Sequence, residues 1–213
     1  MIPKRKGLSR LSIFYKKINH KIENKFCSKS ICYKAIFSNV SFYNVNFKGA
    51  ILTSCSFKDA TFNNVEFLGT NLKKSNLKNA TFKNCIFSAA LLTGANFKGS
   101  KFENCIFANI NFTTAKDLQI NDGNEIISVH SIPTIEADFL ELLNSFKFNQ
   151  YLQNTRVLHL KNGKLNSLTL HILISQLGIE KCKKGLKNLN VFLSSNVITA
   201  YQLCDLIDKA SSD

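Results

Sequence analysis

The hydrophobic positions of the chain follow a period of five residues over residues 30–114. A large apolar residue stands at every fifth position, and a small or β-branched residue stands two positions before it. The first of these series is Cys32, Phe37, Phe42, Phe47, Leu52, Phe57, Phe62, Phe67, Leu72, Leu77, Phe82, Phe87, Leu92, Phe97, Phe102, Phe107 and Phe112. A period of five fits neither a helix, with about 3.6 residues per turn, nor a flat strand, with a period of about 2. It predicts a coil with four short sides that send both series inward.

The same segment also repeats every 20 residues, which is the length of four such sides. The predicted core columns are Phe42, Phe62, Phe82 and Phe102, and Phe47, Phe67, Phe87 and Phe107. A corner column consists of Asn44, Asn64, Asn84 and Asn104. Stacked coils would lie about 4.8 Å apart, like neighbouring strands, so the rings can stack and the amides can pair along each column. We expect a filled core with no ligand channel.

The repeat units resemble those of a known family. Residues 95–99 (Ala-Asn-Phe-Lys-Gly), 70–74, 75–79 and 80–84 look like the consensus A(D/N)LXX of the pentapeptide-repeat family. The resemblance implies a right-handed quadrilateral β-helix of about four coils over residues 30–114. It also implies a non-enzymatic scaffold, because the repeat defines a surface and not a reaction.

The N-terminal segment, residues 1–29, is predicted to form a basic amphipathic helical cap. Apolar residues at helical spacing are Leu8, Leu11, Tyr15, Ile18, Ile22 and Phe26, and the lysines largely off that stripe are Lys16, Lys17, Lys21 and Lys25. One interpretation is a helix that covers the first coil, as a solenoid end requires. The other is a basic helix that binds a membrane surface or an acidic target.

The five-residue period ends after Phe112, and residues 115–133 are predicted to form a cap or linker. Residues 134–213 are predicted to form a small α/β domain whose family we do not recognise. The expected helices cover residues 135–152, 166–177 and 199–210, and the expected strands cover residues 156–160 and 189–193.

The charge of the chain is unevenly distributed. The chain has 28 Lys and Arg against 14 Asp and Glu, a net charge of +14. Residues 1–29 hold nine basic residues and one Glu, residues 30–114 hold nine Lys and three acids, and residues 115–213 are neutral. This asymmetry favours an acidic protein surface as the partner, with a nucleic acid or an anionic membrane as the alternative.

A lysine column is the candidate binding face of the predicted β-helix. It contains Lys58, Lys78 and Lys98, with Lys73 and Lys83 beside it. Lysines spaced like strands repel one another unless anions intervene, so the column either contacts phosphates or carboxylates or remains a solvated surface. We expect no exposed aromatic residue beside it, which argues against base stacking.

The sequence contains no pattern typical of an enzyme or a metal site. Its seven Cys include no C-x-x-C pair, and Cys55, Cys85 and Cys105 stand at inward positions as apolar fillers. The only nucleophile pairing to consider joins His159 or His171 to Cys182 or Cys204, and a buried structural role is favoured for all four. We therefore expect no cofactor, no metal and no catalytic residue.

The expected function is a scaffold that binds another protein through a rigid β-helix surface. Binding of a nucleic acid or an anionic membrane through the basic N-terminal half is the alternative. Some pentapeptide-repeat proteins imitate DNA and bind type II topoisomerases, but that mimicry needs an acidic surface, whereas residues 30–114 are basic. No apolar stretch is long enough to span a bilayer, and the expected location is the cytoplasm, with export by a specialised secretion system left open.

Overall fold

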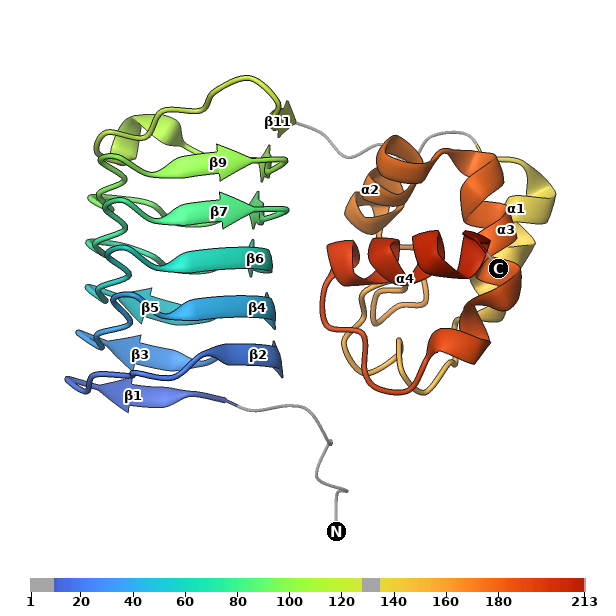
Figure 1. Cartoon of the computed structure of the whole chain (residues 1–213), viewed down its shortest axis with the longest axis horizontal. Coiled ribbons are helices and arrows are strands. Elements are labelled where there is room, and N and C mark those ends of the chain that lie inside the picture. The colour runs from blue at the N-terminus through green and yellow to red at the C-terminus, as the bar shows by residue number, and fades with distance from the viewer. Residues whose placement is uncertain (1–9, 128–134, 213) are drawn as a thin grey trace, which may run out of the picture. The chain divides into compact units, whose positions relative to one another are not determined.

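The computed structural model describes residues 10–127 and 135–212 of the chain. The chain divides into two compact units, Met1–Val129 and His130–Asp213. The first unit is a parallel β-solenoid (Figure 1), which confirms the predicted fold of the repeat segment. The domain boundaries drawn from the sequence stay a prediction.

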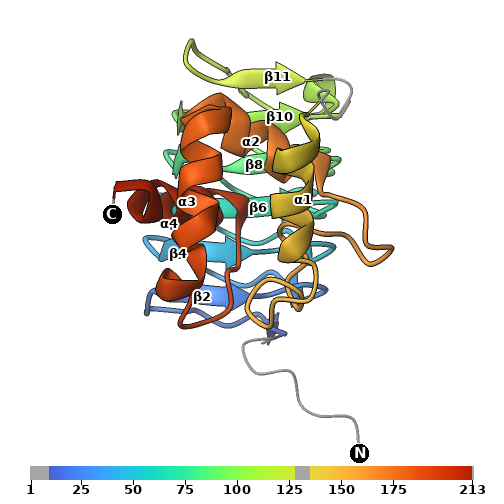
Figure 2. The ribbon, with the colours of Figure 1, turned by 90° about the vertical axis from the view of Figure 1, so that its right-hand side faces the viewer.

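The solenoid is built from short parallel strands that pair with the strand one coil away. They are β1 (Ser12–Phe14), β2 (Ile22–Phe26), β3 (Ile31–Tyr33), β4 (Ser41–Asn46), β5 (Ile51–Thr53), β6 (Thr61–Leu68), β7 (Thr81–Lys83), β8 (Ile86–Ser88), β9 (Lys101–Glu103), β10 (Ile106–Ala108) and β11 (Glu125–Ile127). The longest stack is β2, β4, β6, β8, β10 and β11 (Figure 2), so the solenoid has about six coils, not the predicted four. The difference arises because residues before 30 and after 114 also coil.

Each coil has four sides, which we number from one coil. Side 1 contains residues 40–44, side 2 residues 45–49, side 3 residues 50–54 and side 4 residues 55–59, and units 20 residues away stack on each. The register supports this division, since Phe42 pairs with Phe62 across β4 and β6. Sides 1 and 3 are opposite each other, as are sides 2 and 4.

The phenylalanine columns fill the solenoid core. Phe42, Phe62, Phe82 and Phe102 are buried, and the rings of Phe42 and Phe62 stack with centroids 4.8 Å apart and planes 7° apart. Phe62 and Phe82 repeat this geometry at 4.8 Å and 3°. The second column, which includes Phe87 and Phe107, stacks in the same way at 5.1 Å. Such aromatic pairs contribute roughly 0.5–1.5 kcal/mol each beyond the area that they bury.

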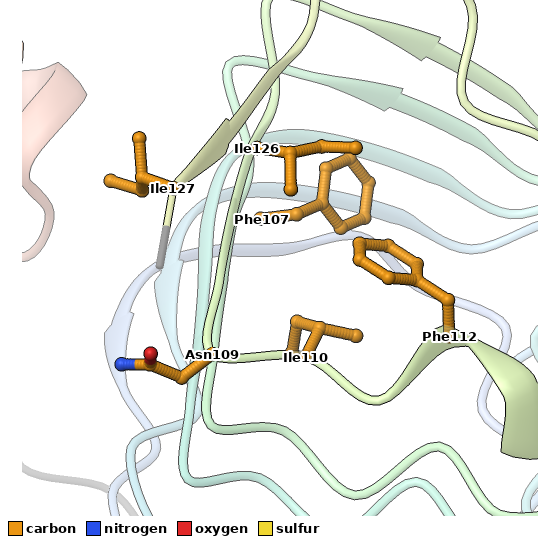
Figure 3. Close-up of a pocket in the computed structure, with 6 residues that line it drawn as sticks. All are labelled: Phe107, Asn109, Ile110, Phe112, Ile126 and Ile127. Carbon is orange, nitrogen blue, oxygen red and sulfur yellow. The ribbon is translucent and has the colours of Figure 1, made fainter. Parts of the chain in front are cut away.

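The C-terminal end of the solenoid has an apolar cleft of about 260 Å³ (Figure 3). Phe107, Ile110, Phe112 and Ile126 point into it, and the side chain of Ile126 is 61% exposed. In β11 the register shortens, because Ile126 lies over Phe107 after 19 residues and not 20. The cleft therefore marks where the regular core ends.

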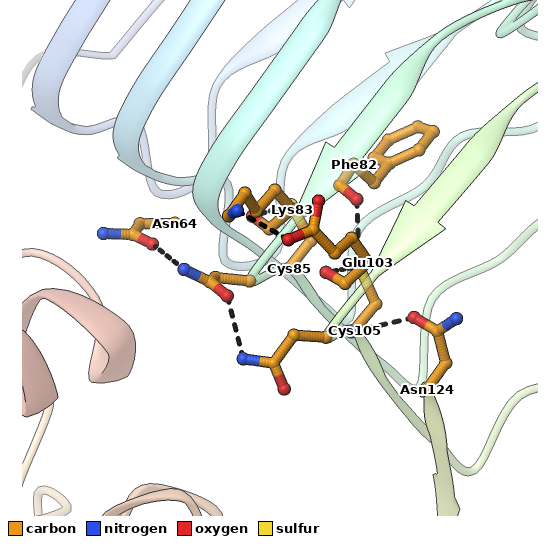
Figure 4. Close-up of polar contacts among 9 residues, drawn as sticks. Asn64, Phe82, Lys83, Cys85, Glu103, Cys105 and Asn124 are labelled. Carbon is orange, nitrogen blue, oxygen red and sulfur yellow. Dashed lines mark hydrogen bonds and ion pairs between the residues drawn. The ribbon is translucent and has the colours of Figure 1, made fainter. Parts of the chain in front are cut away.

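The corners are formed by residues in the left-handed backbone region. Asn44, Asn64, Asn84 and Asn104 have φ between 51° and 55°. The Nδ2 atom of each Asn donates to the Oδ1 of the preceding one, at 3.1 Å for Asn64, 3.0 Å for Asn84 and 2.8 Å for Asn104 (Figure 4). Asn suits this column because it tolerates the left-handed region and its amide both donates and accepts.

The predicted N-terminal helix is wrong over the described residues. Residues 10–26 form a further coil, in which β1 pairs with β3 and β2 pairs with β4. The reason is that an open solenoid edge leaves N–H and C=O groups to be paired, and strands satisfy them where a helix would not. Leu8, which the predicted helix included, lies outside the described residues.

The second unit contains four helices, α1 (Ala137–Ser145), α2 (Ser167–Leu177), α3 (Ile179–Phe192) and α4 (Ala200–Ser212) (Figure 2). Helix α3 packs most extensively on α4, and α2 contacts both. Two predicted helix starts are close to those observed, since α2 begins after Asn166 and the Oγ1 atom of Thr199 accepts from the backbone N–H of Gln202.

The predicted α/β fold of residues 134–213 is wrong, because neither expected strand forms. Residues 189–193 lie in α3 or at its end, where Leu189 is buried and Val191 is 86% exposed. Residues 156–160 contain only an isolated antiparallel bridge between His159 and Leu165. The run Leu-Asn-Val-Phe-Leu alternates like a strand, but Cys182, Leu186 and Leu189 continue one buried helical face.

We predict that Asn84→Gly lowers the free energy of unfolding by about 1–2 kcal/mol, since the hydrogen bonds to Asn64 and Asn104 are lost. Asn84→Ala should lower it by about 1 kcal/mol more, because Ala is strained at the left-handed corner whereas Gly is not. Urea unfolding of the two variants checks this difference. Equal stability of the two variants would contradict the left-handed corner.

We predict that Gly185→Ala destabilises the helical unit by about 1–3 kcal/mol, although Ala is the better helix former. A Cβ atom at Gly185 would lie 2.2 Å from the backbone oxygen of Ile207, so α3 and α4 would have to separate. Thermal unfolding followed by circular dichroism measures the loss. Val191→Ala, at an exposed position of the same helix, is the matched control and should leave the midpoint nearly unchanged.

Candidate binding surfaces

Three lysines of the predicted binding face stack in register on side 4. Bridges between Ser56, Asn76 and Asn96 place Lys58, Lys78 and Lys98 in adjacent coils. The backbone N–H groups of Lys78 and Lys98 donate to the Oδ1 atoms of Asn76 and Asn96 at 3.1 and 3.0 Å. These bonds fix the backbone from which the side chains project. We call Lys58, Lys78 and Lys98 the lysine column.

The other two predicted lysines lie on different sides. Lys73 is on side 3, and Lys83 is on side 1, where its Nζ atom lies 2.5 Å from the carboxylate of Glu103 (Figure 4). Because sides 1 and 3 face opposite directions, the structure does not bring the five lysines onto one surface. Within the column, Lys58 lies 3.7 Å from Asp59, whereas Lys78 and Lys98 form no ion pair with any described residue.

The lysines assigned to the N-terminal helix are distributed around the first coil. Lys16 and Lys17 lie on side 4, Lys21 lies on side 1 and Lys25 lies near the next corner. All four are exposed, and Lys21 pairs with Glu23 at 3.1 Å. They therefore surround the N-terminal end of the solenoid and do not form one face of a helix.

An exposed apolar patch on side 3 was not predicted from the sequence. It consists of Phe14, Tyr15, Ile31, Tyr33 and Ile51. The strand register places Phe14 beside Tyr33 and Ile31 beside Ile51, and the rings of Tyr15 and Tyr33 meet edge to face at 5.6 Å. The signal was present, because the outward positions of side 3 carry Ile, Tyr and Leu where side 4 carries Ser, Asn and Lys.

The seven cysteines are buried free thiols. The Sγ atoms of Cys85 and Cys105 donate to the backbone oxygens of Phe62 and Phe82 at 3.5 Å, so these thiols are oriented inside the solenoid (Figure 4). Burial raises the pKa of Cys55 and of Cys182 to about 12. A thiol with such a pKa is a poor nucleophile, because its thiolate is scarce near neutral pH.

The histidine pairing considered from the sequence is not supported by the contacts of His159. Its Nε2 atom lies 3.4 Å from Asn144 Oδ1, while the Cys182 thiol donates to the backbone oxygen of Leu173 at 3.3 Å. Burial, followed by the nearby Lys147, lowers the pKa of His159. Within residues 10–127 and 135–212, no group of three His, Cys, Asp or Glu could hold a metal ion. No helix of these ranges has the length and apolar character needed to cross a bilayer.

The five-residue register, the four left-handed corners and the stacked core define a class, the parallel β-solenoid built from pentapeptides. Residues 55–121 match the family described as "Pentapeptide repeat region", and residues 27–59 match "Pentapeptide repeats (8 copies)". The N-terminal segment of the chain belongs to the pentapeptide-repeat family. Neither match extends beyond residue 121. No curated protein matches the sequence.

Solved structures of pentapeptide-repeat proteins are similar to this chain. One from Nostoc is 17% identical and has a TM-score of 0.41, with 47% of this chain and 83% of that one covered. One from the Arabidopsis thaliana thylakoid lumen is 23% identical and has a TM-score of 0.35, with 51% and 70% covered. QnrB1, a plasmid-mediated fluoroquinolone resistance protein, is 16% identical and has a TM-score of 0.18, with 55% and 90% covered.

We predict that the free energy of unfolding falls as the pH rises from about 9 towards about 12, because the buried thiols have a raised pKa. Below the pKa of an unfolded thiol both states are protonated and the stability is fully present. Above it the unfolded state loses protons that the folded state keeps, which costs roughly 1.4 kcal/mol per pH unit for each such thiol. Cys182→Ala should therefore show a shallower decline in urea titrations between pH 9 and 10.5. Parallel declines would contradict this origin.

Proposed function

We propose that the protein is a non-enzymatic scaffold that binds an acidic protein surface through its β-solenoid. The observation that carries the proposal is the lysine column of side 4. Its members project from adjacent coils about 4.8 Å apart, so their positive charges repel one another in the free protein. A partner that supplies carboxylates between them would relieve this repulsion.

The rest of the solenoid supports such a role. The backbone of Lys78 and Lys98 is fixed by side-chain hydrogen bonds, and stacked rings fill the core beneath. A rigid surface loses little conformational freedom on binding, which favours affinity. Complementary charge mainly increases the rate and the specificity of association. The location that we propose is the cytoplasm.

The proposal predicts that Lys78→Glu with Lys98→Glu abolishes capture of a protein partner at physiological salt. Lys101→Glu is the matched control, because Lys101 is exposed on side 1 and undergoes the same change of charge. Affinity capture from lysate, with and without nuclease, followed by mass spectrometry, measures the effect. A stoichiometric protein that survives nuclease and the control substitution supports the scaffold.

Two results would contradict it. Capture that disappears after nuclease treatment would assign the column to a nucleic acid. Capture that is lost equally in the Lys101→Glu protein would show a dependence on net charge and not on the lysine column.

A further inference from the structure

The exposed apolar patch is a contiguous surface at the first coils of side 3. The exposed fractions are 49% for Phe14, 67% for Tyr15, 46% for Ile31 and 43% for Ile51. These residues lie on paired strands, so their side chains stand on a flat and fixed backbone. Apolar patches above a few hundred Å² are rare on soluble monomers and mark protein or membrane interaction sites.

The charges around the patch are all positive. The side 3 units, residues 11–15, 30–34, 50–54, 70–74, 90–94 and 110–114, contain no Asp or Glu. Within the patch, the Lys34 ammonium lies 5.6 Å from the ring centroid of Tyr15 and 5.3 Å from that of Tyr33. Lys16 and Lys17, which are exposed, follow directly after Tyr15. An occupant of this surface must therefore be apolar and anionic at once.

Two occupants fit this chemistry poorly. A second copy of the chain would bring Lys34 against Lys34 with no carboxylate to separate them. A single-stranded nucleic acid needs ring faces on which successive bases stack. Here the planes of Tyr15 and Tyr33 are 86° apart, and Ile31 and Ile51 offer no planar surface.

We propose that the patch docks the protein on an anionic membrane surface. Phe14, Tyr15 and Ile31 enter the boundary between headgroups and acyl chains, and Lys16 and Lys34 contact lipid phosphates. Aromatic side chains with lysines beside them are typical of proteins at this boundary, and anionic headgroups supply the charge that side 3 lacks. A fluid bilayer also needs no matching shape. The lysine column lies on the adjacent side, so both surfaces can be occupied together, and loss of one activity leaves the other.

The test uses the full chain and vesicles of phosphatidylcholine, alone or with about one third phosphatidylglycerol. We expect binding to the anionic vesicles only, weakened about tenfold when salt rises from about 0.1 M to about 0.5 M. Phe14→Ser with Ile31→Ser should weaken binding at least tenfold. Tyr43→Ser is the matched control, because Tyr43 is 39% exposed on the opposite side 1, and it should bind as the unaltered protein does.

A fluorescence reporter tests insertion without weakening the patch. The chain contains no Trp, so Phe14→Trp and Tyr43→Trp each introduce a single fluorophore. We expect the emission of Phe14→Trp to shift to shorter wavelength with anionic vesicles and to be quenched by brominated lipid. The emission of Tyr43→Trp should stay unchanged.

Several results would overturn the proposal. Absence of vesicle binding, or equal binding to neutral vesicles, would remove the anionic membrane as occupant. Salt-sensitive binding that survives Phe14→Ser with Ile31→Ser, with no shift in Phe14→Trp, would leave only a general attraction of charge. Binding of oligothymidine, or of a protein from lysate, that depends on Phe14 while vesicles do not bind would assign the patch to that occupant instead.

Discussion

The structure depends on one constraint, which is that every coil must place its side chains directly over those of the coil before it. Phe42, Phe62, Phe82 and Phe102 meet this constraint by stacking their rings, and Asn64, Asn84 and Asn104 meet it by passing a hydrogen bond from coil to coil. The left-handed corner makes both possible, because it returns the chain to the same position after 20 residues. The outward side chains inherit this fixed spacing, so a repeated Lys or Ile becomes a column.

Two neighbouring sides use that spacing differently. On side 4 the outward residues are Ser, Asn and Lys, and Lys78 and Lys98 project as charges without an ion pair among the described residues. On side 3 they include Ile31, Tyr33 and Ile51, with Lys34 among the rings. We infer that the first surface binds carboxylates and the second an apolar, anionic layer. One scaffold would then hold a protein partner at a membrane surface.

The repeat was visible in the sequence because each coil imposes the same requirement on the same positions. The first coil was missed because its register is one residue short, with Ser12 beside Ile31, which broke the period and left a stripe that imitates a helix. The strand expected at residues 189–193 failed because alternation over five residues does not distinguish a strand from a helical face that exposes Val191. The patch was missed because outward positions were considered only for their charge, whereas Ile31 and Ile51 are apolar and exposed.

Amide hydrogen exchange of the full chain, with and without vesicles that contain phosphatidylglycerol, tests the central claim that side 3 is the docking surface most directly. The account predicts slower exchange on vesicle addition in the peptides that cover residues 12–15 and 31–34, with no change in the side 1 peptides around Tyr43. Unchanged exchange in residues 12–15 and 31–34, or equal protection of sides 1 and 3, would contradict it.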